Sequence, residues 1–292
     1  MLPKGKLIII GGHEEKGQKE ENEASGQSLK ILTQKDAQSH FEILGTLIMD
    51  IPRAHHIIEI IASASSIPEE MEDLYINSYK KAGFTHVGFI KVEDEKDASE
   101  PASLKRVKSA HAVFFTGGDQ KKLIRLIAGT PLLAAINRKY HSDKNFMVAG
   151  TSAGAMAIPE TIIAGGLIRE VLYKEDIKIA TGFGLIRGVI VDTHFIKRGR
   201  FARLAHAVAL NPSCLGIGLG EDTALIISEG NHAQCIGSGM VILIDGSKIR
   251  TTNVKTAEGT TPVVIENLKV SIIAEGDNYL LKERKMQKPV RT

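Results

Sequence analysis

A serine in a short glycine-rich turn is the side chain best suited to covalent chemistry in this sequence. Residues 146–157 read FMVAGTSAGAMA, an apolar run followed by Gly-x-Ser-x-Gly and then by small helix-forming residues. A strand, a sharp turn and a helix in that order form a nucleophile elbow, which exposes the serine hydroxyl above a sheet. A side chain at Gly150 or Gly154 would crowd the strand and the helix. Ser152 is the candidate nucleophile; the alternatives are an ordinary glycine-rich turn and an anion-binding loop at a helix N-terminus.

The predicted base for this serine is His194. A serine hydroxyl is a weak nucleophile at neutral pH, so it needs a neighbouring base that a third group holds in place. His194 directly follows an apolar strand in the half of the chain after the elbow, and sites in open parallel sheets lie at the carboxyl ends of strands. His206 lies within a predicted helix and His232 in a predicted turn, which indicates packing or surface positions for both.

The carboxylate best placed to orient the imidazole is Glu221, which also comes just after a predicted strand. Asp192 and Asp222 lie near strand ends too and remain alternatives. The resulting chain order is serine, histidine, acid. In α/β-hydrolases the acid precedes the histidine, so this order argues against that fold in spite of the elbow.

A second glycine-rich turn follows the strand predicted at residues 111–115. Gly117 and Gly118 leave backbone N–H groups uncovered that could face an oxyanion, and Asp119 is a plausible N-cap for the helix that begins near Gln120. A simple Gly-Gly turn explains the same residues.

Three arginines follow the candidate base. Arg200 and Arg203 are three residues apart and should share a helix face, whereas Arg198 should point elsewhere or precede the helix. Guanidinium groups bind carboxylates through two parallel hydrogen bonds, so this segment could hold an acidic peptide. The alternative is a solvated basic helix face.

Alternating strands and helices make up the first half of the chain. This alternation predicts a mainly parallel sheet with helices on both faces. The predicted strands are 6–10, 57–62, 86–92, 111–115 and the strand before Ser152, and the predicted helices include 36–49, 68–82 and 131–139. Residues 14–27 are almost devoid of apolar side chains and indicate a solvated loop.

After residue 159 the pattern changes. A strand ending at His194, a helix over 198–206 and a strand over 215–219 are followed by short, closely spaced strands, which predict an antiparallel and peripheral tail. We find no repeat and no linker. The sequence therefore predicts a single α/β domain over 1–292, with 245–292 as a peripheral β-rich extension.

Composition places the 292-residue chain among globular proteins, with 43% hydrophobic and 24% charged residues. A formal net charge of +3, without a long basic block, argues against nucleic-acid binding. Cys214 and Cys235 are the only cysteines, which argues against a disulfide framework, excludes a multi-cysteine zinc site and favours the cytoplasm. The apolar runs are too short for a signal-peptide core or a membrane span, and no nucleotide, flavin or metal motif is present, so no cofactor, metal or membrane partner is expected.

Taken together, these motifs resemble the cyanophycinase and dipeptidase E family of serine peptidases. The resemblance covers residues 6–244, in blocks that follow the family's order: Gly11-Gly12 with Glu14, 115–120, 150–155, 192–195 with Arg198-Gly199-Arg200, and 218–224. It implies a flavodoxin-like α/β sheet of the glutamine-amidotransferase type, often dimeric. It also implies a Ser152-His194-Glu221 triad, with an oxyanion held by Ala153 and by Gly117 or Gly118.

Chain length, Gln120 and the arginine-rich segment favour the cyanophycinase branch of this family. Its members cut cyanophycin, a polyaspartate with arginine on each side chain, and release β-aspartyl-arginine. The resemblance implies a substrate pocket that includes Gln120, Asp192, Arg198, Arg200 and Arg203. Thr193, where the family has Gln, Lys197 and the 14–27 insertion depart from the pattern.

The leading hypothesis is a cytoplasmic serine exopeptidase that acts on β-linked aspartyl-arginine polymer or related β-aspartyl peptides through an acyl-enzyme. Its partner would be a substrate rich in aspartate and arginine, and the chain would form a homodimer. The alternatives are an isoaspartyl or α-aspartyl dipeptidase and a non-catalytic relative that binds anionic peptides.

Overall fold

The computed structural model describes residues 2–12, 43, 45, 57–65, 75–80, 82–166 and 172–287. The predicted loop at 14–27 lies outside these residues, and of the predicted helix at 36–49 only positions 43 and 45 are described. For the predicted helix at 68–82, the helical residues 75–80 belong to the described part.

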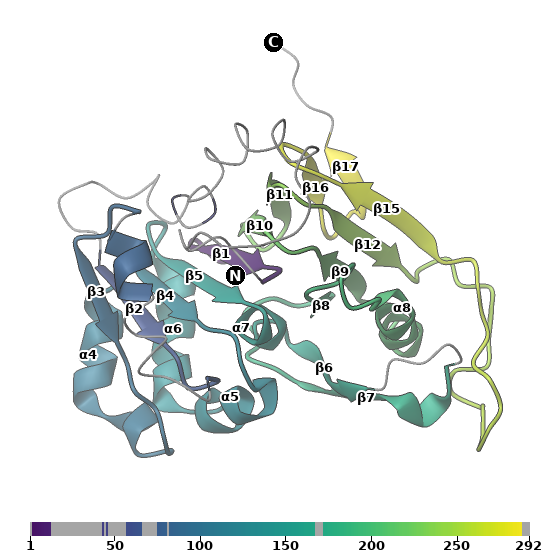
Figure 1. Cartoon of the computed structure of the whole chain (residues 1–292), viewed down its shortest axis with the longest axis horizontal. Helices are drawn as coiled ribbons and strands as arrows, with labels where there is room; N and C mark the ends of the chain where they lie inside the picture. Colours follow the sequence, from purple (N-terminus) through teal and green to yellow (C-terminus); the bar gives the residue numbers. More distant parts are fainter. Residues whose placement is uncertain are drawn as a thin grey trace, which may run out of the picture.

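The predicted parallel sheet is present as one side of a nine-stranded sheet, from β1 to the edge strand β3 (Figure 1), in the order β17-β16-β11-β10-β1-β5-β4-β2-β3. Successive side chains of β1 enter opposite cores: Leu7 and Ile9 face one, Ile8 and Ile10 the other. A strand buried on both faces is apolar at every position, which explains its unbroken apolar run. The parallel strands are β1 (Lys6–Ile10), β2 (Ile57–Ile61), β3 (His86–Phe89), β4 (Ala112–Phe115) and β5 (Met147–Thr151).

Helices cover both faces of this sheet. Apolar side chains of α4 (Pro101–Ser109), α5 (Gln120–Ile127) and α6 (Pro131–Ser142) join the core that Leu7 and Ile9 enter. On the opposite face Tyr75 and Tyr79 pack with their rings against Phe114. The layers are those of the predicted flavodoxin-like α/β fold.

The antiparallel strands after residue 222 are less peripheral than predicted. β10 (Thr223–Ser228) pairs along the whole of β1, and its Leu225 and Ile227 are fully buried. The expectation of a peripheral tail is wrong for β10, because the free edge of β1 needs a hydrogen-bonding partner. The strands β11 (His232–Gly237), β16 (Asn278–Leu280) and β17 (Lys285–Gln287) continue the sheet outward.

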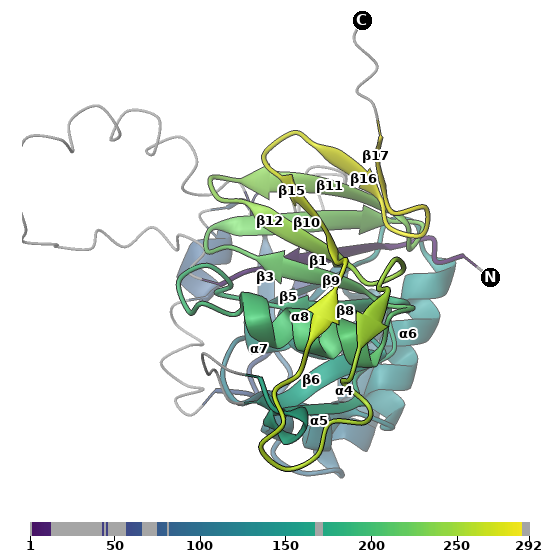
Figure 2. The ribbon, with the colours of Figure 1, turned by 90° about the vertical axis from the view of Figure 1, so that its right-hand side faces the viewer.

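A separate four-stranded sheet, ordered β15-β12-β9-β8, holds the strands on either side of the arginine-rich segment. Side chains alternate between its faces: Val189 and Val191 of β8 join the main core, whereas Ile190 packs with helix α8. In Figures 1 and 2 this sheet and α8 lie beside the main sheet. The elements are β8 (Val189–Asp192), α8 (Phe201–Leu210), β9 (Leu215–Leu219), β12 (Val241–Asp245) and β15 (Lys269–Ile273).

The remaining elements are short. They are η1 (Asp97–Ser99), α7 (Ala153–Ala157), the hairpin of β6 (Thr161–Gly166) and β7 (Ile177–Thr181), η2 (Lys174–Asp176), and the pair β13 (Thr251–Thr252) and β14 (Ile265–Glu266).

The two sheets meet at the carboxyl end of β1. The carbonyl of Gly11 accepts the N–H of His194 at 2.9 Å, and the carbonyl of Gly12 accepts the N–H of Asp222 at 3.0 Å. A Cβ on Gly11 would overlap the carbonyl of Gly220, so only glycine allows this approach. Loops that follow β8 and β9 are thereby fixed above the ends of β1 and β5.

The buried His206 on α8 predicts a pH-dependent stability. The residue is fully buried, and neither ring nitrogen has a hydrogen-bond partner within the described part of the chain. Burial lowers the pKa of His206 from 6.5, although the Asp176 carboxylate opposes the shift. The folded state therefore holds neutral imidazole while the unfolded state gains a proton, and stability falls as the pH drops below about 6.5, by up to about 1.4 kcal/mol per pH unit.

Thermal unfolding from pH 8 to pH 5 measures this effect. We expect His206→Leu to remove part of the acid-side loss of stability. An identical pH slope in the wild type and His206→Leu would show that folding leaves the pKa of His206 unchanged.

Candidate active site

The predicted strand, turn and helix around Ser152 are present as β5, a single turn residue and α7. Ser152 has φ 51° and ψ −115°, a strained backbone conformation typical of functional turns. A Cβ on Gly150 would lie 2.7 Å from the carbonyl carbon of Gly154, and one on Gly154 would overlap the carbonyl of Phe115. The two glycines therefore let the helix start directly against the sheet.

The imidazole of His194 lies against Ser152. The distance from Ser152 Oγ to His194 Nε2 is 3.0 Å. Only 7% of the His194 side chain is exposed. Gly12, at φ +102°, leaves the space for the ring, since a Cβ there would overlap it. With the serine hydroxyl donating, Nε2 must carry the lone pair and Nδ1 the proton.

Glu221 is the carboxylate that the structure brings to this imidazole. His194 Nδ1 lies 2.8 Å from Glu221 Oε1. The two alternatives are engaged elsewhere: Asp192 accepts hydrogen bonds from two arginines, and Asp222 accepts one from Ser238 Oγ at 2.6 Å. The tautomer that lets Nε2 accept from Ser152 is thus the one that donates to Glu221.

The glycine turn after β4 lies next to the serine hydroxyl. Within the described chain, no acceptor takes the N–H of Gly117, Gly118 or Ala153. A Cβ on Gly117 would lie 3.8 Å from Ser152 Oγ, which places this glycine next to the hydroxyl. An oxyanion requires unpaired N–H groups of this kind beside the nucleophile.

Asp119 is the N-cap of α5 as predicted, accepting the N–H of Lys121 at 2.8 Å.

The predicted arginine pair is turned inward onto Asp192. Arg200 Nη1 lies 2.8 Å from Asp192 Oδ1, and Arg203 donates to both oxygens, from Nε at 2.8 Å and from Nη2 at 2.6 Å. Burial lowers the pKa of the Arg200 guanidinium, and the Asp192 carboxylate opposes that shift. Two guanidiniums on one carboxylate leave a surplus positive charge two residues before His194 in the chain.

The predicted pocket residues Arg198 and Gln120 lie on different elements. The helix predicted over 198–206 begins at Phe201, so Arg198 precedes α8, one of the two placements that the spacing allows. Arg198 is exposed. Gln120 Nε2 donates to the carbonyl of Met156 at 3.3 Å, and the buried Thr193 donates from Oγ1 to Met156 Sδ at 3.3 Å. Gln120 and Thr193 thus both contact Met156.

Comparison with known proteins assigns the chain to a family. Residues 36–235, which include Ser152, His194 and Glu221, match the model of peptidase family S51. The chain belongs to peptidase family S51. The cyanophycinase of Synechococcus elongatus is 33% identical over 246 residues, which are 84% of this chain and 76% of that protein. That of Geminocystis herdmanii is 35% identical over 234 residues, 80% of this chain and 85% of that protein.

A solved structure agrees with this fold. The crystal structure of a peptidase from an acI-B1 Actinobacterium matches with a TM-score of 0.62 and 23% identity, over 94% of this chain and 96% of that one. This likeness supports the α/β fold. The family match and the cyanophycinase relatives show that the chain is a serine-type peptidase of the cyanophycinase and dipeptidase E kind.

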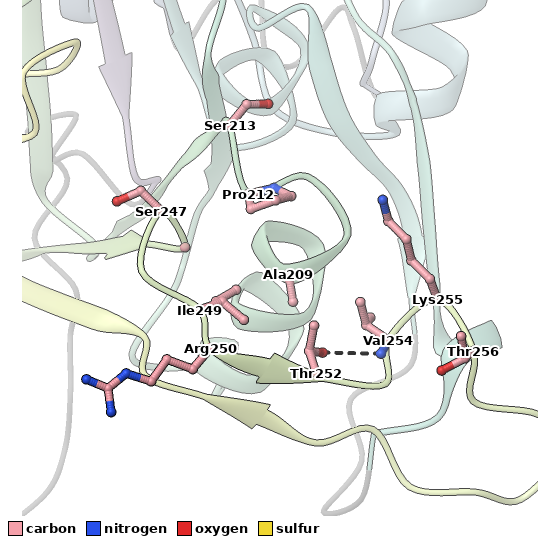
Figure 3. Close-up of a pocket in the computed structure, with 11 residues that line it drawn as sticks. Ala209, Pro212, Ser213, Ser247, Ile249, Arg250, Thr252, Val254, Lys255 and Thr256 are labelled. Carbon is pink, nitrogen blue, oxygen red and sulfur yellow. Dashed lines mark hydrogen bonds between the residues drawn. The ribbon is translucent and has the colours of Figure 1, made fainter.

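A cavity in the described part of this S51 peptidase lies away from Ser152 and His194. It has a volume of about 600 Å³ and opens near Ala209 at the C-terminal end of α8 (Figure 3), whereas Arg200 and Asp192 lie at the other end of that helix. Its lining residues are Ala209, Pro212, Ser213, Gly246, Ser247, Ile249, Arg250, Thr252, Val254, Lys255 and Thr256.

Among the described residues, no three His, Cys, Asp or Glu side chains are grouped so that they could hold a metal ion. The helices of the described part all fall short of the length and apolar character needed to cross a bilayer.

Sequence reasoning missed two residues at the site of this S51 peptidase. Lys197 binds the second oxygen of Glu221, and its only sequence signal was its departure from the family pattern. Gly12 makes room for His194, and its signal was a glycine pair at the end of a buried strand.

Proposed function

We propose that this S51 peptidase hydrolyses β-linked aspartyl peptides, as a cyanophycinase does, through an acyl-enzyme on Ser152. The observation that carries the proposal is the unbroken hydrogen-bonded series from Ser152 Oγ through the His194 ring to Glu221. A serine with a base and an orienting carboxylate at these distances has the geometry of a nucleophile activated for acyl transfer.

In the proposed mechanism His194 Nε2 takes the proton of Ser152 as Oγ attacks the scissile carbonyl. Glu221 stabilises the imidazolium through Nδ1–H. The N–H groups of Ala153 and of Gly117 or Gly118 bind the oxyanion of the tetrahedral intermediate. The imidazolium then protonates the leaving amine, the C–N bond breaks, and a water activated by the same base hydrolyses the ester.

The proposed substrate class follows from the cyanophycinase relatives and from the charge beside the triad. Arg200 and Arg203 outnumber Asp192, so the site attracts the carboxylates of an aspartate-rich chain. Because Arg200 and Arg203 already bond Asp192, we assign them to shaping the pocket. Arg198 has an exposed guanidinium and is the proposed contact for a substrate carboxylate.

Incubation with cyanophycin, β-Asp-Arg and α-linked aspartyl dipeptides, followed by mass spectrometry, tests the function. Release of β-Asp-Arg from the polymer supports the proposal. Cleavage of only the free dipeptides would favour a dipeptidase, and no turnover together with no reaction with a serine-directed phosphonate would favour a binding protein.

Arg198→Ala is expected to raise KM for an aspartate-rich substrate by about two- to tenfold with little change in kcat, because one exposed charge-assisted contact is lost. Added salt should raise KM of the wild type more than KM of the variant. Lys105→Ala, an exposed cation on α4, is the control.

Arg200→Ala should act differently, because it leaves the fully buried Asp192 with one guanidinium fewer, and should lower the melting temperature as well. A KM and salt response of Arg198→Ala equal to those of Lys105→Ala would remove Arg198 from the proposed pocket.

A further inference from the structure

The loop between β8 and α8 carries a second cation for the carboxylate of Glu221. Lys197 Nζ lies 3.1 Å from Glu221 Oε2, while His194 Nδ1 lies 2.8 Å from Oε1 of the same carboxylate. Lys197 and His194 are three residues apart on one turn. The side chain of Lys197 is 64% exposed, whereas that of Glu221 is 25% exposed.

Backbone hydrogen bonds hold this turn in shape. The N–H of Arg198 donates to the carbonyl of His194 at 3.0 Å, and the N–H of Arg200 donates to that of Phe195 at 3.0 Å. Gly199 has φ +58°, a conformation that suits glycine. The turn thereby presents Lys197 and His194 to Glu221 from fixed positions.

We propose that Lys197 is a positioning residue that holds the Glu221 carboxylate with Oε1 directed at His194 Nδ1. The role rests on the proposed function, in which Glu221 orients the base. A partly exposed glutamate has several rotamers and two equivalent oxygens, so its carboxylate can turn relative to His194 Nδ1. A charge-assisted bond to Oε2 removes part of that freedom.

The expected size of the effect is modest, because Lys197 is largely exposed. Exposed ion pairs contribute up to about the equivalent of a fivefold change in an equilibrium constant, and salt weakens them. We therefore expect Lys197→Met to lower kcat about three- to fivefold and to leave KM unchanged, since Lys197 acts on Glu221.

Lys197→Met and Lys197→Arg are compared with the wild type and with Lys105→Met, an exposed cation on α4. Steady-state kinetics on a β-aspartyl peptide give kcat and KM. Proton NMR of the free enzyme gives the low-field resonance of His194 Nδ1–H, which reports the hydrogen bond to Glu221 and is assigned by its loss in His194→Ala.

The proposal predicts that Lys197→Met loses or broadens this resonance and lowers kcat, and that Lys197→Arg restores both. Arginine restores them because it can donate to the same oxygen. In 1 M salt the difference in kcat between the wild type and Lys197→Met should shrink.

Two outcomes overturn the proposal. A resonance and kcat in Lys197→Met equal to those of Lys105→Met would make the pair a solvated surface contact. A raised KM with unchanged kcat and resonance would make Lys197 a substrate contact. The NMR measurement needs no substrate, so a protein that hydrolyses none of the peptides would refute the proposed function while the role of Lys197 is still decided.

Discussion

Ser152→Ala is expected to lower kcat on a β-aspartyl peptide by roughly 10⁴- to 10⁶-fold while the fold is retained, because the nucleophile is lost and the Cβ of the strained turn is kept. His194→Ala should cause a loss of similar size, since Ser152 Oγ then has no base 3.0 Å away. Steady-state rates on the same peptide, with melting temperature as the check on folding, measure both effects.

The double variant distinguishes a catalytic unit from two independent contributions. Triad members act together, so Ser152→Ala combined with His194→Ala should be little slower than either single variant. Losses that multiply in the double variant would contradict the acyl-enzyme mechanism. A wild-type rate in Ser152→Ala would place the chemistry on another residue.

Glu221→Gln should cost up to about 10⁴ in kcat, by analogy with other serine triads. Glutamine has nearly the shape of glutamate but lacks the charge that stabilises imidazolium, and its amide can select the wrong histidine tautomer. His194 Nδ1 lies 2.8 Å from Glu221 Oε1, so a change in the charge of residue 221 acts directly on the base. The pH profile of kcat/KM and the kcat value are the measurements.

Asp222→Asn is the matched control, because Asp222 is the next residue and its carboxylate bonds Ser238. Its effect on kcat should be at least a hundredfold smaller than that of Glu221→Gln. A larger loss in Asp222→Asn or in Asp192→Asn would assign the third position of the triad to that aspartate.

Local sequence patterns predicted many of the strands and the turn at Ser152. The run before Ser152 is mainly apolar because β5 is buried on both faces, and the strands β1, β4 and β9 likewise appear as mainly apolar runs. The glycines at 150 and 154 indicated the elbow, because close strand-helix contact excludes a side chain.

The sequence could not assign strands to sheets. The strands before His194 and Glu221 read like those of the central sheet, yet β8 and β9 form a separate sheet, since register and partners depend on long-range pairing. For the same reason β10 was expected at the periphery, although it pairs with β1 in the interior.

The sequence by itself determined the candidate serine, histidine and set of carboxylates, because chemistry limits each role to a few residue types and strand ends limit their positions. Only the tertiary structure decided among Glu221, Asp192 and Asp222. That decision depends on which carboxylate faces the ring: Asp192 is turned onto Arg200 and Arg203, and Glu221 is brought to His194 where the loops after β8 and β9 dock on Gly11 and Gly12. Residues far apart in sequence meet there through backbone hydrogen bonds that no local pattern encodes.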